Sequence, residues 1–221
     1  MTAMTNPENR LPLMHALPKA DVPTAEPLIL ASGSPRRAEL LAAAGYDFRV
    51  ELPDDAAEDP PTPDETAEHA VRRLAFQKAA DVAGRLTDGW LLAADTLGCC
   101  DGTLLGKPRD EADAERMLRL LRGRTHRVLT GICLWDIAGR RMVLDDVCTE
   151  LEMALLDDHT IAEHLRSMRW QGKAGGFGYQ DGNDWLRVLP GGSESNVVGL
   201  PMERLAEVIQ RFDEWAVPIT N

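Results

Sequence analysis

The chain has 221 residues and a formal net charge of −12 at pH 7. Such an acidic protein lacks the basic surface that broad binding to nucleic acid or to an anionic membrane requires, so we expect neither as a partner. No apolar run approaches the roughly 18–20 residues of a membrane span. The N-terminus shows no basic region followed by an apolar core, so no secretory signal is predicted.

The cysteines also indicate the compartment. Four are present, and none forms a Cys-x-x-Cys pair: Cys99, Cys100, Cys133 and Cys148. In strand-like apolar surroundings they are typical of small buried residues in a reducing environment rather than of a disulfide or a zinc site. We therefore expect a cytoplasmic protein.

Residues 1–26 show no hydrophobic period and predict a flexible tail. We expect one domain over residues 27–214 and a short tail over residues 215–221. The apolar run 28–31 predicts a buried strand. Ser34 and Pro35 then predict the start of a helix that ends near residue 44.

This helix carries Arg36 and Arg37 in its first turn. Cations are disfavoured there, because the free N–H groups and the helix dipole already make that end positive. Their presence makes sense if an anion binds over the helix start. The alternative is that both arginines are simply solvated.

An acidic, proline-rich loop is predicted over residues 53–63. Residues 62–65 form a capping box and predict that a helix begins there and runs to about Gly84. Its apolar face consists of six residues: Ala67, Val71, Leu74, Ala75, Ala79 and Val82. Lys78 lies on the same face, so it either reaches to the edge of the core or points into a polar cavity.

The apolar run 90–94 predicts a strand covered on both faces, and it ends at Asp95. Residues 97–100 and 103–105 predict a hairpin with an Asp-Gly turn. The hairpin brings Lys107 back toward Asp95. Beyond it we expect two helices, two long strands and a final strand and helix, over these ranges: 110–121, 127–135, 140–155, 160–168, 185–189 and 202–212.

Two glycine-rich stretches interrupt these elements. Residues 172–182 contain five glycines, which suits close approach of the backbone to a ligand, and residues 191–196 predict a turn-rich loop. Three histidines have no ligand-like spacing and are expected to be structural or exposed: His126, His159 and His164.

Four cations come from separate segments, each next to a loop or on an inward face: Arg36, Arg37, Lys78 and Lys107. A cationic cluster in an acidic protein suits a compact anion such as a triphosphate. Asp95 adds a carboxylate, which favours a divalent cation bridging it to phosphate oxygens. Glu58 is the expected second carboxylate, and Glu39 is a weaker candidate.

With these residues in place, the chain resembles the Maf family of nucleoside triphosphate pyrophosphatases. The resemblance rests on seven motifs in the family's order: Ser32-Gly-Ser-Pro-Arg-Arg37, Arg73-Leu-Ala-Phe-Gln-Lys78, Ala94-Asp-Thr96, Gly106-Lys-Pro108, Thr130-Gly131, Gly172-Lys-Ala-Gly-Gly-Phe-Gly-Tyr-Gln180 and Ser195-Asn-Val-Val-Gly-Leu-Pro201. They span about residues 28–212.

The resemblance implies a two-lobed α/β fold like that of inosine triphosphatases, with a mixed sheet flanked by helices and a central cleft, usually in a homodimer. It implies a hydrolase that acts on acid anhydrides, cutting a nucleoside triphosphate into the monophosphate and pyrophosphate with Mg²⁺ or Mn²⁺. The four cations would hold phosphates, and Ser32 would line the phosphate loop. Gln180 would help to hold the nucleotide, and Asp95 would bind metal or activate water.

The motif wording is similar to the branch that prefers dTTP and UTP. Two departures from the family pattern stand out. Met168-Arg169 replaces a common Gly-Glu, and Gly172 replaces a common Asp. Two alternatives therefore stay open: the same chemistry on a modified nucleotide such as N7-methyl-GTP, and a non-catalytic nucleotide-binding regulator of cell division.

Overall fold

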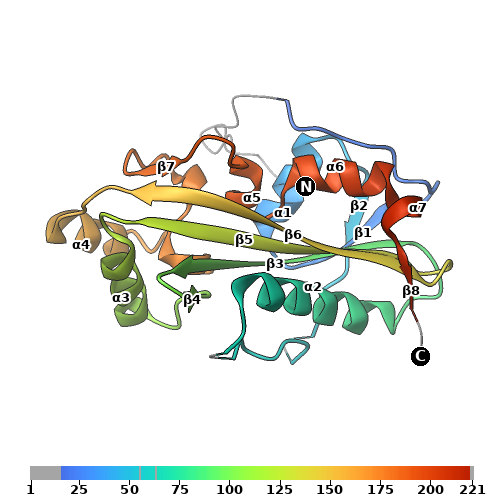
Figure 1. Ribbon diagram of the computed structural model, residues 1–221, viewed down its shortest axis with the longest axis horizontal. Coiled ribbons are helices and arrows are strands. Elements are labelled where there is room, and N and C mark those ends of the chain that lie inside the picture. Colours follow the sequence, from blue (N-terminus) through green and yellow to red (C-terminus); the bar gives the residue numbers. More distant parts are fainter. Residues whose placement is uncertain (1–15, 55, 63, 220–221) are drawn as a thin grey trace, which may run out of the picture.

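The computed structural model describes residues 16–54, 56–62 and 64–219 (Figure 1). A mixed eight-stranded sheet runs through the molecule in the order β2-β1-β3-β5-β6-β7, with β4 paired to β3 and β8 paired to β6. The strands are β1 (Leu28–Ala31), β2 (Phe48–Val50), β3 (Trp90–Cys100), β4 (Thr103–Leu105), β5 (Thr125–Asp136), β6 (Arg141–Met153), β7 (Leu186–Val188) and β8 (Val217–Pro218). The mixed α/β architecture expected from the sequence is confirmed.

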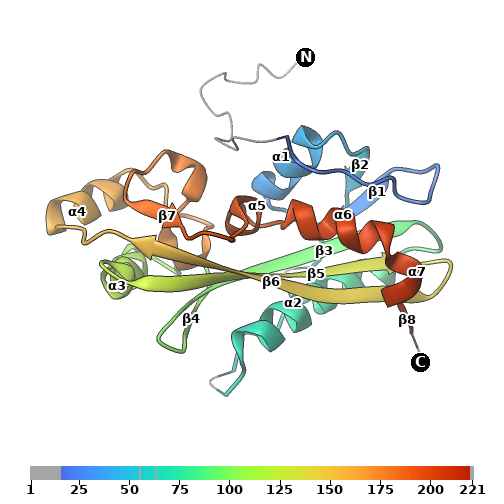
Figure 2. The same cartoon turned by 45° about the horizontal axis from the view of Figure 1, so that its top comes forward.

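Helices cover both faces of this sheet. They are α1 (Pro35–Ala43), α2 (Ala67–Ala83), α3 (Glu111–Leu121), α4 (Asp158–Arg166), α5 (Glu194–Val198), α6 (Met202–Gln210) and α7 (Phe212–Trp215), with two 3₁₀ turns, η1 (Ala174–Gly176) and η2 (Tyr179–Asp181). Figure 2 shows α2 below the sheet and α1, α5 and α6 above it. None of these helices is both long and apolar enough to cross a membrane.

Alternation along β3 decides which residues meet which helices. Trp90 and Leu92 face upward into a core shared with α6, whereas Leu91 and Ala93 face α2. A second core lies at the other end of the sheet, between α3, α4 and β7. These two cores, each with helices of its own, form the two lobes of the molecule.

The sheet is interrupted along one edge of β3. β1 runs parallel to β3 and pairs only with residues 91–93. β4 runs antiparallel and pairs with residues 98–100. Since β5 occupies the opposite edge along nearly the whole strand, residues 94–97 have no partner strand on this edge. The chain leaves both β1 and β4 at this gap.

Most predicted elements are present, but three differ. The strand predicted to end at Asp95 continues to Cys100, so Asp95 lies in the middle of β3, because pairing with β5 carries the strand past it. The capping box does not start α2: Thr66 is the N-cap and accepts a hydrogen bond from the His69 amide. Glu65 instead receives two hydrogen bonds from the Arg73 guanidinium. The turn-rich loop predicted at residues 191–196 contains the start of α5, which is capped by Ser193.

The ends of the described chain contact the folded core. Ala20 is buried, and its amide donates to the Tyr46 hydroxyl at 3.0 Å. Residues 1–15 of the predicted tail lie outside the described residues. At the other end β8 pairs with β6, within the segment that the sequence assigns to a tail. The proposed division at residues 26 and 214 stays a prediction.

Gly131 allows α2 to lie directly on the sheet. It pairs with Asp95 in the β3–β5 ladder. A Cβ atom at this position would stand 2.2 Å from the Val71 carbonyl oxygen of α2. Only glycine therefore lets the helix backbone come this close, and the same helix carries Lys78 toward Asp95.

We predict that Gly131→Ala destabilises the protein by about 3 kcal/mol, because the new methyl group overlaps helix backbone that cannot rotate away. For a domain of this size, the melting temperature would fall by roughly 6–12 °C in differential scanning calorimetry. Gly84→Ala is the matched control. Gly84 closes the same helix at φ −60° with only ordinary contacts around its Cβ position, so the change should be neutral or slightly stabilising. Equal effects of the two changes would contradict this account.

Candidate active site

A cavity of about 560 Å³ opens at the gap in β3. Segments far apart in the chain line it: residues 32–37, 52–54 and 58, Lys78 of α2, residues 95–96 of β3, Lys107, Val128 of β5, residues 171–174 and 177–180, and residues 197–199 at the end of α5. Asp95 and Thr96 point to opposite faces of the sheet, yet both line the cavity. The missing strand makes this arrangement possible.

The Lys78 ammonium lies between two carboxylates at the bottom of this cavity. Its distance is 2.5 Å to Asp95 Oδ1 and 3.1 Å to Glu58 Oε2. Lys78 and Asp95 are 5% and 8% exposed, respectively, whereas the Glu58 side chain is 35% exposed. The inward stripe of α2 therefore places Lys78 in a polar cavity, which was one of the two interpretations of the sequence.

Arg37 is buried and fixed by three hydrogen bonds. Its Nε donates to the Gly199 carbonyl at 2.8 Å. The two terminal nitrogens donate to Ser32 Oγ at 3.0 Å and Thr96 Oγ1 at 3.1 Å. Arg37 thus ties the loop after β1 to β3 and to the end of α5, and its remaining N–H groups are available to the cavity.

The Ser-Asn motif holds α5 in place to receive Arg37. Asn196 is fully buried and donates to the Val128 carbonyl at 3.0 Å and to Thr149 Oγ1 at 2.9 Å. Thr130 Oγ1 donates to the Asn196 carbonyl at 3.1 Å. This motif therefore fixes α5 on the same side of the sheet as α1, where it meets Arg37 (Figure 2).

Arg36 points to a different wall. Its Nη2 donates to the Gly172 carbonyl at 2.9 Å, across 136 positions of the chain. Gly172 has a positive φ of 67°, and Arg169 donates to the Asp181 carbonyl at 3.2 Å. Of the two departures from the family pattern, Gly172 thus lines the cavity, whereas Arg169 contacts the loop behind it.

The remaining predicted residues also border this space. Lys107 follows β4, and partial desolvation together with the charges of Lys78 and Arg37 lowers its pKa. Gln180 presents an Oε1 that is buried without a hydrogen-bond partner among the described residues. All eight predicted site residues line the cavity: Ser32, Arg36, Arg37, Glu58, Lys78, Asp95, Lys107 and Gln180. Glu39 is not among the lining residues.

Among the polar lining residues that the sequence interpretation missed, two make side-chain contacts within the site. Thr96 bonds Arg37, and Lys173 forms an ion pair with Asp181. Thr96 directly follows Asp95, and Lys173 is the only cation among residues 172–182. The sequence signal for both residues was their position: each lies within a motif that already contained a predicted site residue.

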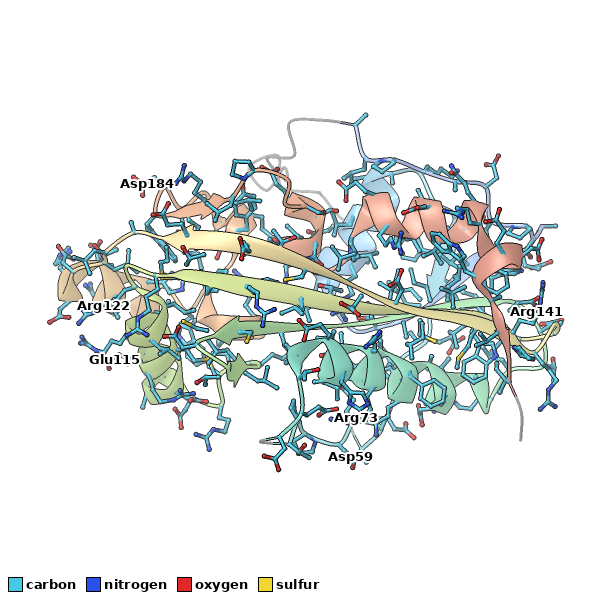
Figure 3. All side chains as sticks on the ribbon, in the orientation of Figure 1. Asp59, Arg73, Glu115, Arg122, Arg141 and Asp184 are labelled. Atoms are coloured by element: carbon cyan, nitrogen blue, oxygen red, sulfur yellow. The ribbon has the colours of Figure 1, made fainter. Side chains whose placement is uncertain are left out.

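The acidic residues 56–62 are fastened to α2 beside the cavity through Asp59. Arg73 donates to the Asp59 carbonyl at 3.0 Å, and Gln77 donates to the Asp59 carboxylate at 2.7 Å. Figure 3 shows Arg73 and Asp59 together below the sheet. Because Glu58 directly precedes this anchor, the segment delivers its carboxylate to Lys78.

Comparison with known proteins agrees with this geometry. The model of the Maf-like protein family matches residues 27–212. The chain belongs to the Maf family. It is 56% identical over 213 residues to a dTTP/UTP pyrophosphatase of Rhodopirellula baltica, covering 94% of each chain. It is 39% identical over 185 residues to a dTTP/UTP pyrophosphatase of Geobacter sulfurreducens, covering 84% of this chain and 96% of the relative.

A solved structure, a nucleoside-triphosphatase named as a dITP/XTP pyrophosphatase from Mycobacterium abscessus, matches 86% of this chain and 96% of its own. The TM-score is 0.41 and the sequence identity is 18%. At this level of similarity the match adds no support, and the assignment to the Maf family rests on the family model and the sequence relatives.

The donor set of this Maf protein suits a hard divalent cation that takes few of its ligands from the protein. The described residues contain no group of three or more side chains fit to hold a metal by themselves. Asp95 and Glu58 nevertheless approach one and the same cationic group. Two carboxylates with room for phosphate oxygens match the preference of Mg²⁺ for few protein ligands.

A buried histidine supports the glycine-rich wall of the cavity. His126 is 2% exposed and meets Phe177 edge-on, with ring centroids 5.4 Å apart. Burial lowers the pKa of His126 to about 4. The folded protein therefore keeps this imidazole neutral at a pH where the unfolded chain protonates it.

We predict that acid weakens folding through His126. The unfolded chain takes up the proton as the pH falls below about 6.5, and the folded protein does so only near pH 4. Stability is therefore complete above pH 6.5 and falls below it, by about 2 kcal/mol from His126 between pH 7.5 and pH 5. Urea unfolding of wild type and His126→Phe at both pH values measures this difference. The exposed His159 provides the control variant His159→Asn, which should keep the wild-type dependence. An unchanged dependence in His126→Phe would show that other groups cause it.

Proposed function

We propose that this Maf protein hydrolyses dTTP and UTP to the nucleoside monophosphate and pyrophosphate with the help of Mg²⁺ or Mn²⁺. The observation that carries the proposal is a single cavity that is lined by Arg36, Arg37, Lys78 and Lys107 together with the buried carboxylate of Asp95. A cluster of cations in an acidic protein can bind a polyphosphate, and a buried carboxylate in the same cavity can orient a water molecule for attack on phosphorus.

In the proposed reaction, Asp95 orients a water molecule toward the α-phosphorus and accepts its proton. A bond forms between the water oxygen and the α-phosphorus. The bond from the α-phosphorus to the bridging oxygen breaks, and pyrophosphate leaves with that oxygen. Lys78 and Lys107 neutralise charge that develops on the phosphate oxygens, the main contribution of protein groups to phosphoryl transfer.

Asp95 and Glu58 would hold the metal together with phosphate oxygens. When bound, the metal supplies Lewis-acid stabilisation of phosphate charge. Lys78 already lies between the two carboxylates, so it keeps them close together before any substrate arrives.

The pyrimidine preference is supported by the relatives that carry this name. Gln180 supports it from the structure, since its buried Oε1 has no donor among the described residues. The imide N3–H of uracil or thymine is such a donor, and leaving a buried acceptor unpaired costs about 1–3 kcal/mol.

We predict that the wild-type protein releases pyrophosphate from dTTP and UTP faster than from other triphosphates, and that chelation of the metal stops the release. Asp95→Asn should lower kcat at least about 100-fold, because the amide cannot accept the water proton. Product identification by ion-exchange chromatography and a coupled pyrophosphate assay measure both. Asp88→Asn, at an exposed position just before β3, is the control. Nearly full turnover by Asp95→Asn would contradict the assigned role.

Assays with a panel of nucleoside triphosphates, including N7-methyl-GTP, distinguish this function from the two alternatives. Preferred turnover of N7-methyl-GTP would keep the chemistry and change the substrate. Tight binding of nucleotide without turnover by any divalent metal would favour a regulator of cell division.

We further propose a homodimer that works in the cytoplasm. All four cysteines are free thiols, three of them buried, and such thiols persist in a reducing compartment. Light scattering coupled to size-exclusion chromatography should give twice the mass of one chain at micromolar concentration. A single-chain mass across the whole concentration range would refute the dimer.

A further inference from the structure

A buried ion pair closes the glycine-rich loop beside the cavity. Lys173 Nζ lies 2.7 Å and 2.5 Å from the two carboxylate oxygens of Asp181, and the two side chains are 13% and 10% exposed. Gly178 packs directly on the pair, since a Cβ there would be 2.6 Å from both Lys173 Nζ and Asp181 Oδ2. The loop is therefore built around this contact.

The same loop is connected to the opposite wall through Arg36. The Arg36 guanidinium donates to the carbonyl of Gly172, the residue directly before Lys173. Arg36 lies in the first turn of α1 in one lobe, whereas the loop belongs to the other lobe. This hydrogen bond spans the cavity, and Arg36 keeps further N–H groups for a ligand.

Asp181 is the counter-ion for several cations that meet here. Burial lowers the pKa of Lys173, Asp181 opposes that effect, and the positive charges of Arg36 and Arg169 add to it. Burial likewise lowers the pKa of Arg36, and Asp181 again acts in the opposite direction. Without Asp181, three cations would repel one another, and Lys173 would be buried with no carboxylate beside it.

Asp181 itself is not among the residues that line the cavity. Its contacts are with the loop, through the Lys173 ammonium and through the hydrogen bond from Arg169 to its carbonyl. Any effect on a ligand must therefore pass through a neighbour that does line the cavity, as Arg36 does.

We propose that Asp181 is a positioning residue that holds the glycine-rich loop closed on Lys173 and thereby keeps Arg36 stretched across the cavity to receive the polyphosphate. The inference rests on the proposed function for its substrate. Asp181 then acts on substrate binding rather than on the chemical step, because Asp95 and Lys78 lie at a separate part of the cavity.

A double-mutant cycle tests this route. Asp181→Asn should raise KM for UTP about tenfold and leave kcat within about twofold, and in an Arg36→Ala background the same change should have little further effect on KM. The cycle isolates action through Arg36, which a merely structural loss of stability would not show. Additive effects on KM in the two backgrounds, or a lower melting temperature with unchanged KM, would overturn the proposal.

Two further variants complete the experiment. Asp184→Asn removes an exposed carboxylate close by in the sequence, which points away from the molecule in Figure 3, and should leave KM unchanged. Asp181→Glu keeps the charge but moves it by one methylene, so KM should lie between those of wild type and Asp181→Asn. If Asp181→Asn does not fold, the cycle is run with Asp181→Glu, and a wild-type KM for Asp181→Glu then overturns the proposal.

A binding measurement separates this inference from the proposed function. If the wild type turns over no triphosphate, the proposed function fails. The cycle is then repeated with the Kd of inorganic tripolyphosphate measured by calorimetry. Non-additive Kd values support the role of Asp181, and additive ones refute it.

Discussion

The contact of the Lys78 ammonium with the Asp95 and Glu58 carboxylates is the interaction on which the site depends. Removing charges from water is expensive, and a buried pair repays that cost only when geometry and additional partners are good. Here the geometry comes from the fold: Gly131 admits the backbone of α2 onto the sheet, directly beside the strand position of Asp95. Lys78, two turns farther along the helix, then reaches the carboxylate from below. A backbone contact without any chemistry of its own thus determines where the charges meet.

The two adjacent arginines of α1 have different roles: Arg37 holds the structure of the site, and Arg36 is available to a ligand. Arg37 turns inward and bonds three segments that would otherwise leave the cavity without a defined wall. Arg36 turns outward and reaches the other lobe. Their first-turn position is unfavourable for cations by about 0.3–1 kcal/mol each. The bonds of Arg37 offset that cost in the free protein, whereas Arg36 gains most from an incoming anion.

Much of the site followed from the sequence because its residues interrupt or follow recognisable local patterns. Asp95 ends an apolar run, Lys107 follows a hairpin, and Lys78 interrupts an apolar stripe; local period and turn chemistry reveal such positions. The long-range pairs did not follow. Nothing local shows that the carboxylate of Asp181 faces Lys173, or that Thr96 accepts from Arg37. The start of α2 was misplaced for a related reason, since Glu65 is held by Arg73 two turns away and the helix is capped by Thr66.

The gap along the edge of β3 also determines the width of the cavity opening. β1 and β4 run toward each other along the same edge, so the chain leaves each of them facing the other across the four residues 94–97. The width of the opening is therefore the number of unpaired residues multiplied by the rise per strand residue, about 3.3 Å. One more paired residue in β1 or β4 would shorten the gap by about 3.3 Å. It would bring Arg36 and Arg37, which follow β1, closer to Lys107, which follows β4. The lengths of β1 and β4 therefore set the size of the anion that fits between residues 32–37 and Lys107. Either strand can change in length without any change in a charged side chain.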